Sequence, residues 1–205
     1  MSLKSKLLRS HVAAVLLTLA IAAPSVAQTS VTAPLKTVAA ALSKIRIDNF
    51  GQVDANYYRG ALPKGNDFTD LKAVGVKTLI DLTNGDGQSA EEGLARQAGL
   101  KFFRIPMDTH VVPTAQEMAA FLKIVTDPTN QPVYVHCVGG RHRTGVMTAI
   151  YRMTQDHWTS DQAFQEMKKY KFGADFLHPE FKKFVYDFKN AAAAALPAPA
   201  GGSNQ

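Results

Sequence analysis

The sequence contains one cysteine, Cys137, among its 205 residues. An intramolecular disulfide is therefore excluded, and the hydrophobic core alone must stabilise the fold. The basic residues do not form a stripe interleaved with aromatic residues, which argues against nucleic acid as a partner. The histidines and carboxylates do not show the spacing of a metal-binding motif, so the sequence predicts neither a metal nor a cofactor.

The chain also lacks an apolar run long enough to span a bilayer comfortably. The candidate run at residues 12–23 follows three basic residues and precedes small residues at 25–27 that suit cleavage. We therefore predict a signal peptide at 1–27 and an exported protein, periplasmic or secreted, with no stable membrane span after cleavage. An uncleaved membrane anchor is the alternative. Cleavage removes three basic residues and no acidic one, so the net charge falls from +6 to +3.

The rest of the chain divides into three predicted parts. Residues 28–44 are alanine-rich and form a linker or a frayed short helix, residues 45–194 form one folded domain, and residues 195–205 form a disordered tail. Within the domain, short β-prone runs alternate with helical patterns, which predicts an α/β fold with a mainly parallel layered sheet flanked by helices. Three helix starts have capping-box spacing: Ser89 with Glu92, Thr114 with Glu117, and Thr159 with Gln162.

The domain is organised around the loop that follows His136. A short apolar run ends at His136, and a largely apolar helical pattern follows Gly145. A strand that turns into a helix through a glycine-bearing loop forms an anion cup, because backbone N–H groups converge there and the helix N-terminus is partly positive. We expect a phosphate to be bound by the loop residues Val138, Gly139, Gly140, Arg141, His142 and Arg143.

Four side chains of this stretch suit phosphate chemistry. Cations and helix N-termini stabilise a thiolate, so Cys137 is expected to be the nucleophile. Arg143 has a planar fork that binds two phosphate oxygens at once. Thr144 is placed to donate a hydrogen bond to the sulfur and make it a better leaving group, and His136 is placed to orient the loop by bonding backbone carbonyls.

The run from His136 and Cys137 through five residues to Arg143, Thr144 and Gly145 resembles the signature loop of the cysteine-dependent protein tyrosine and dual-specificity phosphatases. Its second half, Arg-His-Arg-Thr-Gly, is similar to the Lys-His-Arg-Thr-Gly form of the plant and fungal atypical dual-specificity group, which includes inositol pyrophosphate phosphatases. Residues 58–63 resemble bacterial periplasmic tyrosine phosphatases. The resemblance, over about residues 49–176, implies a phosphatase fold, a phosphocysteine intermediate, and a phosphorylated protein (tyrosine, serine or threonine) or inositol polyphosphate as substrate.

The same resemblance implies a mobile loop with an aspartate general acid some thirty residues before the cysteine. Asp108 is the only carboxylate between Phe102 and Gln116 and is assigned as that acid. His110 is the alternative acid, and a solvated loop without an acid is the other alternative.

The sequence allows two roles for each of two arginines. Arg59 either supports the phosphate loop or is a surface residue at a strand end. Arg141 either meets a second phosphate of a polyanionic substrate or pairs with a nearby acid and shapes the loop. Two other functions compete with a phosphatase, namely a rhodanese-type sulfurtransferase and a phosphate-binding module with little turnover.

Overall fold

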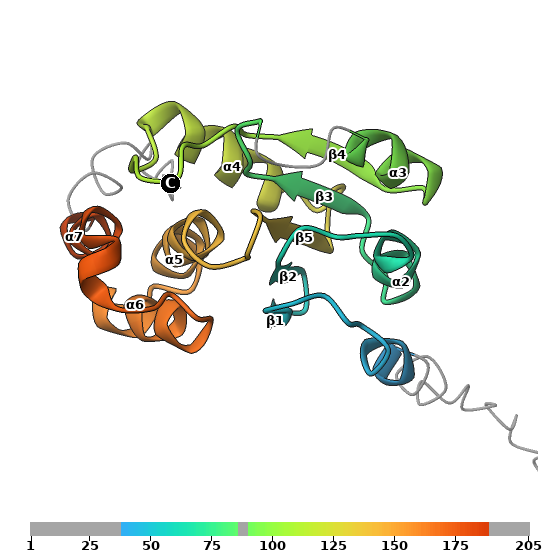
Figure 1. Ribbon diagram of the computed structural model, residues 1–205, viewed down its shortest axis with the longest axis horizontal. Coiled ribbons are helices and arrows are strands. Elements are labelled where there is room, and N and C mark those ends of the chain that lie inside the picture. The colour runs from blue at the N-terminus through green and yellow to red at the C-terminus, as the bar shows by residue number, and fades with distance from the viewer. Residues whose placement is uncertain (1–37, 86–89, 189–205) are drawn as a thin grey trace, which may run out of the picture. The chain divides into compact units, whose positions relative to one another are not determined.

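A five-stranded sheet forms the centre of the part of the chain that the structure, a computed structural model, describes, which is residues 38–85 and 90–188 (Figure 1). The predicted signal peptide at 1–27 and tail at 195–205 lie outside the described residues. The strand order is β1-β2-β5-β3-β4, and only the β1–β2 pair is antiparallel. The prediction of a mainly parallel α/β sheet is confirmed. The strands are β1 Gly51–Asp54, β2 Tyr57–Gly60, β3 Thr78–Asp81, β4 Lys101–Arg104 and β5 Val133–His136.

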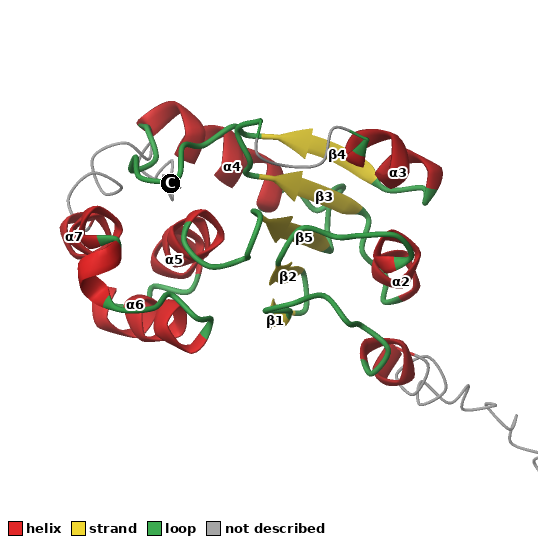
Figure 2. Cartoon of the chain, viewed as in Figure 1, coloured by secondary structure: helices red, strands yellow, loops and turns green. Residues whose placement is uncertain are grey.

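Helices cover both faces of this sheet (Figure 2). Two short ones, α2 (Asp67–Ala73) and α3 (Glu91–Gln97), lie on one face, with a helical stretch at residues 38–42 near the sheet edge. The opposite face carries α4 (Ala115–Val125), α5 (Arg143–Gln155), α6 (Ser160–Lys169) and α7 (Pro179–Asp187), with the 3-10 turn η1 (Asp175–Leu177) between the last two.

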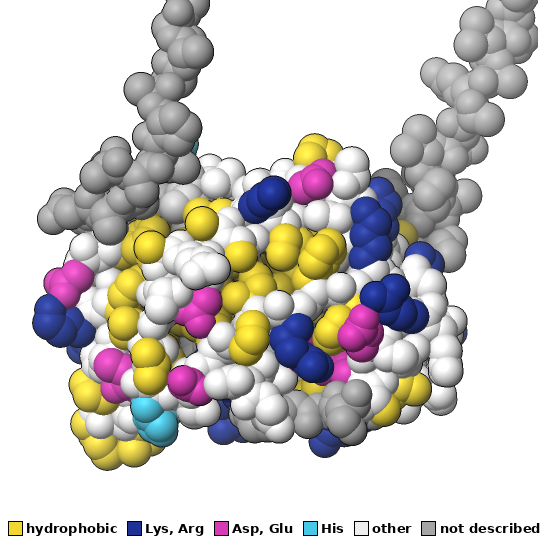
Figure 3. Space-filling model, turned by 90° about the horizontal axis from the view of Figure 1, so that it is seen from above, with side chains coloured by type: hydrophobic (Ala, Val, Ile, Leu, Met, Phe, Trp, Pro, Cys, Tyr) yellow, Lys and Arg dark blue, Asp and Glu magenta, His cyan; other side chains and the backbone are white. Residues whose placement is uncertain are grey.

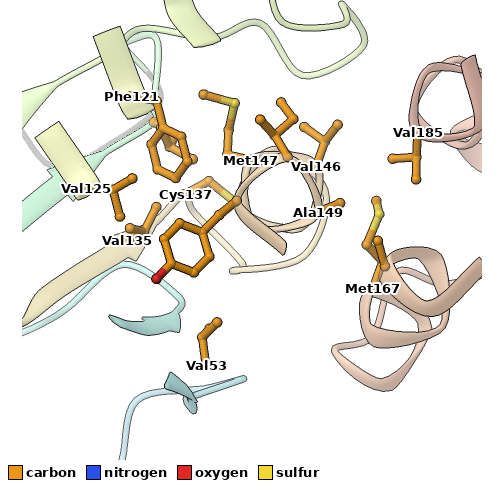
Figure 4. Packing of buried hydrophobic residues seen from close by; sticks show 14 of the residues in the cluster. Val53, Phe121, Val125, Val135, Cys137, Val146, Met147, Ala149, Met167 and Val185 are labelled. Carbon is orange, nitrogen blue, oxygen red and sulfur yellow. The ribbon is translucent and has the colours of Figure 1, made fainter. Parts of the chain in front are cut away.

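The central strand β5 separates two hydrophobic clusters. Its side chains alternate between the faces of the sheet, so Val133 and Val135 join the cluster under α4 to α7, and Tyr134 joins the cluster under α2 and α3. Cys137 belongs to the first cluster and lies among the core side chains drawn in Figure 4, including Phe121. Cys137 is thus packed into the hydrophobic core beneath α4 to α7.

Local signals explain where two of the helices begin. Thr114 and Glu117 form a reciprocal capping box at the start of α4, and Thr159 with Gln162 does the same for α6, as predicted. The predicted box of Ser89 with Glu92 involves a residue outside the described part of the chain, and α3 begins at Glu91 after Ala90, which makes no side-chain cap. Glu91 is fully buried.

The carboxyl ends of the parallel strands bring polar residues into one row. In the register of the sheet, His136 lies between Gly60 and Asp81, and Asp81 is paired with Arg104. Open α/β sheets bind ligands outside this edge. The loop after His136 is therefore at the expected place for a site.

The described helices include none that is long and apolar enough to cross a bilayer. On the face shown in Figure 3, lysine and arginine side chains lie among acidic and hydrophobic ones and do not form a single stripe. This distribution offers no extended basic track on that face.

Candidate active site

The loop between β5 and α5 surrounds a cavity of about 360 Å³. Cys137 and Arg143, each 4% exposed, both line it, so the structure brings the predicted nucleophile and the predicted phosphate-binding cation to one space. The cavity is lined by Thr109, Cys137, Val138, Gly139, Arg141, His142 and Arg143. Gly140 belongs to the same loop but does not line the cavity. Asp108 does not line it either.

The backbone of the loop is oriented for an anion. The carbonyl of Val138 accepts a hydrogen bond from the Leu62 N–H at 3.2 Å, and the carbonyl of Arg141 accepts one from the Gly145 N–H at 3.1 Å. Within the described residues, the N–H groups from Val138 to His142 donate to no other group. The carbonyls are held by the protein, which leaves these donors available to a bound anion.

Arg59 supports the loop from behind. Its side chain is fully buried, its Nη2 donates to the Gly140 carbonyl at 2.8 Å, and its guanidinium lies 4.1 Å from the centre of the Tyr170 ring. Asn49 donates to the same Gly140 carbonyl at 2.8 Å and to the Tyr170 carbonyl at 2.9 Å. The loop-support interpretation of Arg59 is therefore favoured over the surface one.

Gly140 occupies a position that other residues do not tolerate. Its φ is +64°, and a Cβ there would lie 2.3 Å from the carbonyl carbon of Gly60. At the neighbouring Gly139, a Cβ would meet only the Arg141 side chain, at 3.5 Å. The close approach of two backbones at Gly140 and Gly60 fixes the curvature of the cup.

His136 is held differently from the prediction. Its Nε2 lies 2.7 Å from Oε1 of the buried Glu91, and neither ring nitrogen completes a well-formed hydrogen bond within the described residues. Arg104 pairs with Asp81 at 2.6 Å and lies 4.0 Å from Glu91. The expectation that His136 bonds backbone carbonyls is wrong, because a buried carboxylate occupies its surroundings. Nothing in the spacing of Glu91 signals this role.

Thr144 does not make the predicted bond to sulfur in this structure. Its hydroxyl is buried and has no hydrogen-bond partner within the described part of the chain. Its carbonyl accepts a hydrogen bond from the Thr148 hydroxyl at 2.7 Å. A role for the Thr144 hydroxyl in expelling the thiolate stays a prediction.

The loop that carries Asp108 contacts the cup through its neighbours. Arg143 donates to the Met107 carbonyl at 3.1 Å, and Thr109 lines the cavity. The exposed Asp108 carboxylate instead accepts a hydrogen bond from Nδ2 of Asn84 at 2.6 Å. To protonate a leaving group, Asp108 must turn from Asn84 into the cup, a small motion for an exposed loop side chain. His110 points to Glu180.

A cysteine and an arginine in an anion cup at the carboxyl edge of a mainly parallel sheet define a cysteine-dependent phosphatase. A family model described as "DSP-PTPase phosphatase fused to NAD+ Kinase" matches residues 29–183. The chain therefore belongs to this phosphatase family, and the family and enzyme class expected from the signature loop are confirmed.

Individual relatives agree with this assignment. A probable tyrosine-protein phosphatase of Dictyostelium discoideum is 29% identical over 126 residues, or 60% of this chain and 75% of that protein. The dual specificity protein phosphatase TpbA of Pseudomonas aeruginosa is 27% identical over 125 residues, 61% of this chain and 56% of TpbA. The catalytic core of the PP-IP phosphatase SIW14 of Saccharomyces cerevisiae has a TM-score of 0.62 at 24% identity, covering 73% of this chain and 92% of that one. None of these favours a sulfurtransferase.

The curvature of the cup can be tested at its glycines. Gly140→Ala should lower kcat/KM by about 10²-fold, because the backbone must shift away from Gly60 and misplace the donors. Gly139→Ala should cause a much smaller loss, since its Cβ meets only a flexible side chain. Steady-state hydrolysis of p-nitrophenyl phosphate by both variants measures the difference. Equal losses would show that the contact with Gly60 does not shape the site.

The role of Asp108 can be tested with leaving groups of different basicity. Asp108→Asn should lower kcat by roughly 10²–10⁴-fold for an alkyl phosphate, and by much less for p-nitrophenyl phosphate, whose leaving group needs little protonation. Asn84→Ala frees the carboxylate and should not reproduce this pattern. Equal losses on the two substrates would assign Asp108 a structural role, and no loss on either would favour His110.

Proposed function

We propose that the protein hydrolyses phosphomonoesters through a phosphocysteine intermediate. The observation that carries the proposal is the shared cavity of Cys137 and Arg143 beneath a row of unengaged backbone donors. Catalysis of phosphoryl transfer depends mostly on positioning and on stabilising charge on the equatorial oxygens, which this cup supplies.

In the first step, the Cys137 thiolate attacks phosphorus in line with the leaving oxygen, and the P–O bond breaks as the S–P bond forms. Arg143 and the loop N–H groups hold the equatorial oxygens, while Asp108 donates its proton to the leaving oxygen. In the second step, a water molecule attacks phosphorus and gives a proton to the Asp108 carboxylate. The S–P bond breaks, and Cys137 returns as the thiolate.

The rim of the cup favours substrates with more than one phosphate. Arg141 is 47% exposed and lies 3.7 Å from Asp48, which Lys171 contacts more closely at 2.5 Å. An exposed pair at such a distance contributes little, so Arg141 stays available to a substrate. Arg141, beside Arg143 in the loop, suits a second phosphate of an inositol polyphosphate, the substrate class implied by the atypical group. A phosphorylated protein is the second candidate, suggested by the tyrosine phosphatase relative.

We also propose that the protein is exported to the periplasm or secreted. Residues 1–27 have the charged, apolar and small-residue segments of a signal peptide. The absence of a second cysteine is compatible with an oxidising compartment, where the thiolate of Cys137 cannot form an internal disulfide.

The chemistry is tested by separating binding from turnover. Cys137→Ser should abolish hydrolysis of p-nitrophenyl phosphate yet still bind phosphate, because the backbone donors and Arg143 remain. Arg143→Lys should weaken both binding and rate, since an ammonium cannot make the bidentate contact. Residual turnover by Cys137→Ser, or a thiosulfate–cyanide transfer activity in the unmodified protein, would refute the phosphatase proposal.

The substrate class is tested at Arg141. A charge-assisted hydrogen bond contributes roughly 1.5–3 kcal/mol, so Arg141→Ala should reduce kcat/KM for an inositol polyphosphate at least about tenfold more than for p-nitrophenyl phosphate. Arg96→Ala, which removes an exposed arginine of α3 outside the cup, is the matched control. A proportional loss on both substrates at fixed ionic strength would instead favour a phosphoprotein substrate.

A further inference from the structure

Two histidines and a glutamate converge beside the cup without lining it. His110 belongs to the loop between β4 and α4 that carries Asp108, while His178 and Glu180 lie at the start of α7. These segments are far apart in the sequence, so no spacing pattern could reveal the group. One ligand atom from each of the three residues lies within 4.8 Å of the other two.

The distances between these ligand atoms fit the coordination shell of a small metal ion. Nδ1 of His178 lies 3.2 Å from Oε1 of Glu180, and Nδ1 of His110 lies 3.5 Å from that same oxygen. In a tetrahedral zinc site with bonds near 2.0–2.1 Å, neighbouring ligand atoms are about 3.3 Å apart. Two of the three distances between ligand atoms are therefore already close to this value. To bind the same ion, the His110 ring must rotate out of its stack with His178, and its side chain is 69% exposed.

The imidazole rings of two of these residues lie against each other. The imidazoles of His110 and His178 are stacked, with centroids 4.8 Å apart and planes 16° apart. A divalent ion bound here would attract both histidine nitrogens and the carboxylate together.

We propose that His110, His178 and Glu180 form a site for a divalent transition metal of the zinc class. Two imidazoles and a carboxylate are a donor set that Zn²⁺ uses in proteins, with a water molecule in the fourth position. His178 is 7% exposed and anchors the site, whereas His110 gives access from solvent. None of the three residues lines the cavity of the cup.

A metal ion bound at this site would restrain the loop that carries Asp108 from outside the cup. His110 is two residues from Asp108, so an ion bound here ties the loop of the predicted acid to α7. On its other side, His178 packs against His142 of the cup, with ring centroids 3.7 Å apart.

The test is metal binding by protein that carries Cys137→Ser, because this substitution removes the thiolate as a competing ligand. Titration with ZnCl₂ by calorimetry, and with CoCl₂ by the visible absorption of tetrahedral cobalt, should show a saturable site. His110→Gln and Glu180→Gln should each weaken the affinity at least about tenfold. His110 is exposed, so its replacement leaves the fold intact.

His157→Gln is the matched control, since His157 is an exposed histidine outside the cluster. It should leave the zinc affinity unchanged. The proposal is overturned if no saturable binding is found, or if binding survives both His110→Gln and Glu180→Gln. If His157→Gln alone lost affinity for zinc, the ion would be bound at another surface position. That result would equally overturn the proposal.

Discussion

A buried cation without a paired acid holds the anion cup together. Arg59 is fully buried, and no carboxylate of the described residues forms an ion pair with it. Leaving such a charge unpaired costs several kcal/mol, and burial lowers the pKa of its guanidinium. Negative charge on Tyr57 and Glu166 opposes that shift most strongly among the nearby groups. The hydrogen bond from Arg59 to the Gly140 carbonyl ties this buried cation to the loop.

Cys137 and His136 face opposite sides of the sheet. Cys137 packs in the cluster under α4 to α7, whereas His136 stacks on Tyr134 in the other layer, with ring centroids 5.7 Å apart. Because Cys137 directly follows His136, its sulfur is one residue away from the ring that lies against the buried Glu91. Contacts in both helical layers therefore surround the loop, and such supporting contacts oppose the repulsion of its converging N–H dipoles.

The sequence predicted the cup because its essential parts are contiguous. A strand, a glycine-bearing loop and a helix are local patterns, and Cys137 and Arg143 lie in that one stretch. The predicted parallel sheet and two capping boxes are likewise periodic or short-range signals. The contacts of His136 with Glu91 and of Asp108 with Asn84 join separate segments, and only the register of β3, β4 and β5 brings them together.

The residues that support the cup are far apart in the sequence. This separation affects when the site forms during folding. The Gly140 carbonyl is held by residues 81 and 91 positions away, and Asn49 also reaches across 121 positions to Tyr170. Contacts of such long range form late in folding, because their loop-closure entropy must first be overcome. The β1–β2 hairpin and the end of α6 must both be in place before the loop adopts its curved conformation. A partly folded chain therefore contains the complete signature sequence but no phosphate site.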